Sequence, residues 1–78
     1  MTLAEMKPGQ SARIGSINTS DPATIRLMVL GLIEGTVVRF EHAAIGGDPI
    51  EISVFGASMS IRKQQALQFQ VMAVCTRE

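Results

Sequence analysis

The residue types that carry most enzyme chemistry are scarce in this sequence. It contains one His, one Cys and no Trp or Tyr. His42 has no carboxylate partner at the spacing of a catalytic pair, so we expect an ordinary side chain at the rim of the fold. Cys75 lacks the second Cys of a CxxC motif, and we expect an inert thiol. The sequence therefore predicts no catalytic residue and no enzyme activity.

Direct binding of a metal ion is an alternative that the sequence leaves open. The candidate ligands are Glu41, His42 and Cys75. Structural zinc sites generally use four ligands and catalytic ones three, whereas these residues have no paired spacing. The methionines form no MxM or MxxM cluster, and Met28 and Met59 fall on predicted core faces. We therefore expect no resident metal and no cofactor.

Two glycine-containing segments are candidates for phosphate-binding loops. Residues 31–35 lack the Lys-Ser/Thr pair of a P-loop and follow a predicted helix instead of preceding one. Gly46-Gly47-Asp48-Pro49 is typical of a hairpin turn. The three Phe residues are not set among clustered basic side chains, and seven basic residues balance seven acidic ones. No nucleotide or nucleic acid partner is expected.

Length and composition predict one small domain over residues 1–78. The chain has a mass of 8.4 kDa, 46% hydrophobic residues and a formal net charge of zero. The longest apolar stretch, residues 27–33, is far too short to span a membrane, so no membrane insertion is expected. A lone Cys suits a reducing compartment, and the predicted location is the cytoplasm.

One α-helix has clear start and end signals. Asp21-Pro22 supplies an N-cap followed by a proline at the first helical position, which predicts a helix through Leu30. Gly31 occupies the left-handed position that ends many helices, with Leu32 placed to pack back onto Leu27. The predicted buried face consists of four apolar residues at helical spacing: Ile25, Met28, Val29 and Leu32.

Alternating apolar residues predict short strands around this helix. The first nine residues are expected to be a lead-in, and residues 63–66 a single helical turn. The expected strands are residues 10–17, 36–43, 49–54, a short strand ending at 62, and 68–74. This order is typical of a mainly β fold, a small bent antiparallel barrel of about five strands with one α-helix after the first strand.

Several apolar residues fall on the outward phase of these elements. A contiguous apolar patch would mark a protein partner. An exposed edge strand would also permit self-association. The residues concerned are Leu30, Val37, Phe55, Met72 and Val74.

Several short motifs, taken in order, resemble the FeoA family of bacterial ferrous iron transport. The resemblance covers about residues 3–74 and implies an SH3-like barrel with a helix inserted after the first strand. Two departures are Glu34 and Ile45, which replace prolines common in the family. The motifs are Arg26-Leu27, Leu30-Gly31-Leu32, Gly35-Thr36, Gly47-Asp48-Pro49-Ile50, Ile61-Arg62-Lys63 and Phe69-Gln70-Val71.

The resemblance also implies a function. FeoA proteins are regarded as cytosolic accessories of FeoB, the membrane Fe²⁺ transporter with a cytosolic GTP-binding domain. The expected partner-binding residues lie in family motifs or beside them, at positions the core does not need: Arg26, Leu30, Glu34, Ile45 and Asp48.

A second interpretation follows from the same resemblance, because this module also occurs as the C-terminal domain of metal-dependent repressors. The chain would then be a stand-alone regulatory module that contacts a repressor or another soluble protein. It has no helix-turn-helix motif and begins with Met1, so a free-standing relative is expected.

Overall fold

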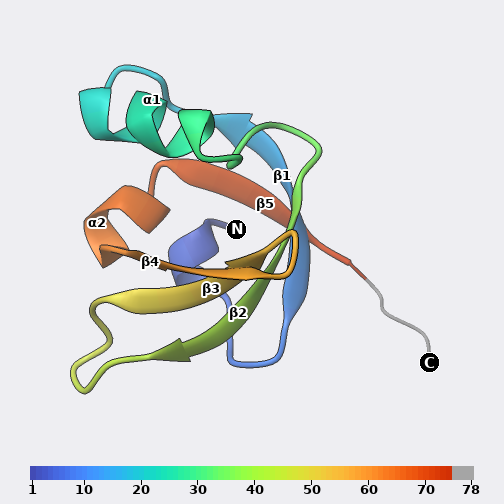
Figure 1. The fold of residues 1–78 in the computed structure, drawn as a ribbon, viewed down its shortest axis with the longest axis vertical. Coiled ribbons are helices and arrows are strands. Elements are labelled where there is room, and N and C mark those ends of the chain that lie inside the picture. Colours follow the sequence, from blue (N-terminus) through green and yellow to red (C-terminus); the bar gives the residue numbers. More distant parts are fainter. Residues whose placement is uncertain (75–78) are drawn as a thin grey trace.

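The computed structural model describes residues 1–74, which form a mainly β structure with short helices (Figure 1). In chain order the elements are the 3₁₀ helix η1 (Leu3–Glu5), β1 (Ser11–Ile17), α1 (Pro22–Val29), β2 (Val37–Ala43), β3 (Ile50–Val54), β4 (Ala57–Ile61), α2 (Lys63–Ala66) and β5 (Phe69–Ala73). The predicted fold class is confirmed, as are all five strands, the helix after the first strand and the one-turn helix before the last. Each observed boundary lies within two residues of the prediction.

All five strands belong to one antiparallel sheet in the order β4-β3-β2-β1-β5. The register shifts between Ile14 and Ser16 in β1 and between Phe40 and His42 in β2. Such bulges bend a strand and increase its twist, which lets a short sheet curl around its own core. Figure 1 shows α1 at one end of this curled sheet and the β2–β3 hairpin at the other.

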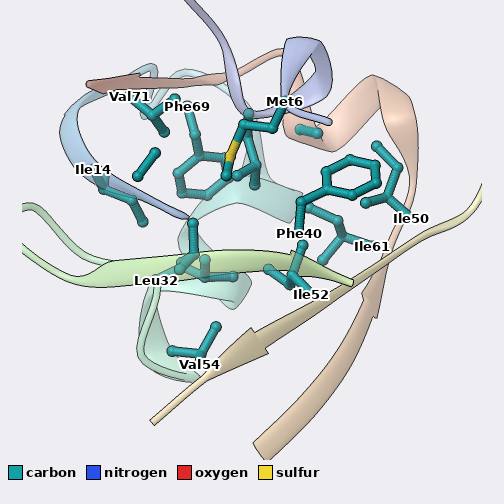
Figure 2. Packing of buried hydrophobic residues seen from close by; sticks show 14 of the residues in the cluster. Met6, Ile14, Leu32, Phe40, Ile50, Ile52, Val54, Ile61, Phe69 and Val71 are labelled. Atoms are coloured by element: carbon teal, nitrogen blue, oxygen red, sulfur yellow. The ribbon is translucent and has the colours of Figure 1, made fainter. Parts of the chain in front are cut away.

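The core lies inside the curve of the sheet and comes from alternate strand residues. In β3, for example, Ile50, Ile52 and Val54 are buried while Glu51 and Ser53 are half-buried on the other face. Figure 2 shows the side chains of Ile50, Ile52 and Val54 in the same buried cluster as those of the other strands. The remaining buried hydrophobic residues are Leu3, Met6, Ala12, Ile14, Leu27, Leu32, Val38, Phe40, Ile61, Ala66, Phe69 and Val71.

The N-terminal segment corrects the expectation of a simple lead-in. Leu3 in η1 is fully buried and Met6 is 5% exposed, and the Met6 side chain points into the cluster in Figure 2. The Val71 N–H donates to the Met1 carbonyl at 2.8 Å, and Thr2 bridges to Gln70. A domain this small buries little surface, so a segment without clear periodicity still contributes core residues.

Candidate functional site

The residues with ligand chemistry do not converge within residues 1–74. That part of the chain contains no group of three or more His, Cys, Asp or Glu placed to hold a metal ion. Glu41 lies 3.9 Å from the Arg39 guanidinium, and exposed His42 stands opposite Glu51 on the neighbouring strand. Cys75, the third of the candidate metal ligands, lies outside the described residues.

Helix α1 is held at both ends as its sequence predicts. The Asp21 carboxylate accepts a hydrogen bond from the Ala23 N–H at 2.9 Å, and Pro22 opens the helix. At the other end Gly31 has a φ of +119°, and the Leu32 N–H donates to the Leu27 carbonyl at 3.2 Å. A 3.0 Å bond from the Gly31 N–H to the Met28 carbonyl completes the predicted Schellman motif.

The side of α1 that faces the core differs from the prediction. Thr24 and Leu27, three residues apart, are the buried ones. Ile25 is 45% exposed and Val29 is 82% exposed, so assigning them to the buried face was wrong. This two-turn helix carries apolar residues on several of its sides, so periodicity alone could not identify the side that is buried.

The signal that could have located the buried face is the Schellman motif. In this motif the residue after the glycine frequently contacts the residue four positions before the glycine. Here these residues are Leu32 and Leu27. Leu32 is fully buried, which turns the Leu27 side of the helix inward. Ile25 and Val29 are then left on the outside.

A run of exposed apolar side chains consequently follows the outer side of α1. We call Ile25, Val29, Leu30 and Phe55 the α1 surface. Leu30 is 59% exposed and Phe55, in the β3–β4 turn, is 81% exposed. The Phe55 ring lies against Gly31, where an added Cβ would sit only 3.4 Å from its Cε2. The turn and the helix end therefore present their apolar side chains side by side.

The five residues predicted to bind a partner are all exposed, but the structure divides them between two places. Arg26, Leu30 and Glu34 lie on α1 and the turn after it. Ile45 and Asp48 lie in the β2–β3 hairpin, at the opposite end of the molecule in Figure 1. These two groups cannot form one continuous small contact surface.

Asp48 makes a structural contact that its position in the sequence did not indicate. Its Oδ1 accepts a hydrogen bond from the Lys63 N–H at 3.0 Å, at the first residue of α2. The Arg62 N–H donates to Gln65 Oε1 at 2.9 Å in the same turn. Asp48 thus satisfies one of the donors that a helix start leaves unpaired and links the hairpin to α2.

None of the helices among the described residues is both long and apolar enough to cross a bilayer.

A shallow hollow of about 230 Å³ is lined by Pro49, Ser60, Ile61, Arg62 and Gln65. It is open to solvent and lies between the end of β4 and α2. Over residues 1–74, the curved five-stranded sheet forms a small β-barrel with exposed apolar side chains along α1.

Comparison with known families agrees with this architecture. The model of the FeoA domain matches residues 1–72, and the chain belongs to the FeoA domain family. This family is implicated in ferrous iron transport and is not a known enzyme family. No curated protein matches the chain.

Solved structures give the same result. A FeoA protein from Chlorobium tepidum is 32% identical with a TM-score of 0.88, over all of this chain and 74% of that one. The zinc complex of Stenotrophomonas maltophilia FeoA is 29% identical with a TM-score of 0.81, over 92% of this chain and 89% of that one. That protein is described as a prokaryotic SH3-domain protein proposed as an activating factor of ferrous iron transport. The SH3-like fold implied by the sequence motifs is confirmed.

The same fold occurs within a larger regulator. A manganese-dependent transcriptional repressor in complex with manganese has a TM-score of 0.85, over 95% of this chain and 36% of that one. At 17% identity, this likeness establishes a shared fold.

Proposed function

We propose that the chain is a cytoplasmic accessory protein of bacterial ferrous iron uptake that binds the transporter FeoB through the α1 surface. The observation that carries this proposal is the run of exposed apolar side chains from Ile25 through Val29 and Leu30 to Phe55. Membership of the FeoA family supplies the transport context.

The α1 surface has the composition of a small protein interface. Interface centres are enriched in apolar and aromatic residues, and their rims are polar. Arg26 and Glu34 supply exposed charges on the helix and on the turn after it. Burial of one large apolar side chain contributes roughly 1.5–3 kcal/mol, so Val29, Leu30 and Phe55 can account for a specific contact.

Both ends of α1 are closed by hydrogen bonds, so the exposed side chains project from a fixed backbone. A pre-organised surface loses less conformational entropy on binding than a mobile loop does. The β2–β3 hairpin residues Ile45 and Asp48 form a second and smaller contact in this proposal.

Affinity capture from detergent-solubilised membranes that contain FeoB tests the proposal. Tagged wild-type chain should retain the transporter, and Val29→Asp should lower capture at least about tenfold because a charge then enters an apolar contact. The matched control is Ile45→Asp, which places the same charge at the other end of the molecule and should lower capture less than about threefold.

Two outcomes would contradict the proposal. The wild-type chain could fail to capture the transporter in every nucleotide and iron state. Alternatively, Val29→Asp could retain the transporter as well as the wild type does, while remaining folded by circular dichroism.

The repressor likeness supports a second candidate, a free-standing regulatory module that contacts a soluble regulator. The same capture experiment separates the two. Recovery of a soluble regulator, with FeoB present in the input and absent from the eluate, would favour the second candidate.

A further inference from the structure

The two edges of the sheet differ in whether their backbone is covered. On β5, the Val71 N–H donates to the Met1 carbonyl at 2.8 Å and Gln70 bridges to Thr2, so the N-terminal segment pairs with this edge. On β4, β3 is the only strand partner among the described residues. The β4 edge is therefore open within residues 1–74.

The hairpin geometry identifies the unpaired groups of β4. The β3–β4 turn has two residues, Phe55 and Gly56, both with positive φ, as in a type I′ hairpin. The flanking pair in such a hairpin is hydrogen-bonded, and pairs alternate along the strands. Ala57, Met59 and Ile61 therefore bond to β3, and the N–H and C=O groups of Ser58 and Ser60 point away from it.

Side-chain contacts agree with this assignment. Ser60 Oγ donates to Glu51 Oε1 at 2.7 Å, and these residues are directly opposite in the register. Side chains approach more closely in non-hydrogen-bonded pairs, which is the pair type assigned to Ser60. Ser58 and Ser60 are also exposed, and no described residue outside the β3–β4 ladder bonds to their backbone.

The open edge lacks the features that usually prevent strands from pairing between molecules. Natural edge strands are protected by charged side chains, proline, bulges or a covering segment. Residues 57–61 read Ala-Ser-Met-Ser-Ile, with no charge and no proline, and their pairing with β3 is regular. The formal net charge of the chain is zero, so long-range repulsion does not oppose association of two copies.

We propose that the β4 edge pairs with the β4 edge of a second copy of this chain, antiparallel and about a two-fold axis at Met59. Ser58 of each copy then lies opposite Ser60 of the other. A hydrogen-bonded pair exchanges two bonds, so the two Ser58–Ser60 pairs make four. Met59 meets Met59 of the second copy on the axis, which brings the two half-buried side chains together.

The pairing is symmetric because the β5 edge is covered. Pairing of β4 with β5 of another copy would be head-to-tail and could propagate, but Met1 and Thr2 already occupy that edge. Self-pairing of β4 uses the only open edge of the described sheet on both copies and closes as a dimer. The hollow beside Ser60 and Ile61 leaves space next to the end of this edge.

A five-residue edge predicts a weak dimer whose population rises with concentration. Sedimentation equilibrium from about 10 µM to about 1 mM should show the mass moving from 8.4 kDa towards twice that value. Ser58→Pro removes an outward N–H that β3 does not use, and proline is tolerated at such edge positions. It should raise the dimer dissociation constant at least about tenfold, since two of the four bonds are lost.

The matched control is Ser58→Ala, which removes the hydroxyl and keeps the N–H. It should dimerise as the wild type does. A monomer throughout the concentration range would overturn the proposal, and so would a dimer that Ser58→Pro leaves unchanged while the variant is folded.

A second measurement uses the wild-type chain alone, and it tests the proposal even if the proline variant does not fold. In a mixed sample of differently labelled chains, the α-protons of Met59 in the two copies should give an intermolecular nuclear Overhauser effect, because directly opposed residues of a non-hydrogen-bonded pair are close. Intermolecular contacts confined to the α1 surface would overturn the proposal. Both tests use the chain alone and are independent of any transporter.

Discussion

The end of α1 and the β2–β3 hairpin both carry family motifs, and both expose a large apolar residue, yet they differ in what surrounds that residue. Leu30 belongs to the α1 surface together with Ile25 and Val29, and the Phe55 ring lies against the adjacent Gly31. Ile45 is fully exposed beside Gly46-Gly47, and an added Cβ on either glycine would meet no atom within 4 Å.

The two regions also differ in how their polar residues are used. In the hairpin, the Asp48 carboxylate accepts the Lys63 N–H and thus stabilises the start of α2. Near α1, the side chains of Arg26 and Glu34 make no hydrogen bond or ion pair with another described residue. Exposure and a family motif together therefore do not define a docking surface, because a contact also needs neighbouring apolar area.

The largest expected effect tests which side of α1 faces the core. Leu27→Ala should lower the free energy of unfolding by about 2–5 kcal/mol, since it leaves a cavity where a buried side chain was. Val29→Ala, two residues further along, should change it by less than about 0.5 kcal/mol. Urea unfolding followed by circular dichroism measures both, and equal effects would contradict the assigned face.

An intermediate effect is expected in the hairpin. Asp48→Ala should lower the free energy of unfolding by about 0.5–2 kcal/mol, the range for loss of a helix-capping acceptor. Asp48→Asn keeps an oxygen acceptor and serves as the control, with a smaller loss. Thermal unfolding of the wild type and the two variants measures these differences. An Asp48→Ala chain as stable as the wild type would show that the bond to Lys63 contributes nothing to stability.

The smallest effect is expected at the hairpin tip. Ile45→Ser should leave the free energy of unfolding within about 0.5 kcal/mol, because the side chain is already exposed. Capture of the transporter should fall less than about threefold. A loss as large as that of Val29→Asp would reverse the comparison and make the hairpin the main contact.

Sequence patterns were most informative where a local rule applies. The Asp21-Pro22 helix start, the Gly31 helix end and the alternation of Ile50, Ile52 and Val54 depend on neighbours in the chain, and the structure confirms each. The FeoA resemblance, which rests on short ordered motifs, is confirmed by the family match over residues 1–72. The predicted partner-binding residues stay a proposal.

The errors occurred where packing between distant segments decides. Leu3 and Met6 have no clear periodicity, and they are buried because the N-terminal segment docks against β5 and α2. Strict alternation from Ile14 and Phe40 would turn Ser16 and His42 inward, but a register shift just before each of them leaves both exposed.

By itself, then, the sequence determined the elements, their order and the family, since caps, turns and alternation are set by hydrogen bonds and side chains within a few residues. Tertiary structure alone decided which side of α1 is exposed, that Asp48 holds α2, and that, within residues 1–74, β5 is covered while β4 is open. These properties depend on which segments meet in space, and apolar residues on several sides of a short helix satisfy local rules equally well in more than one arrangement.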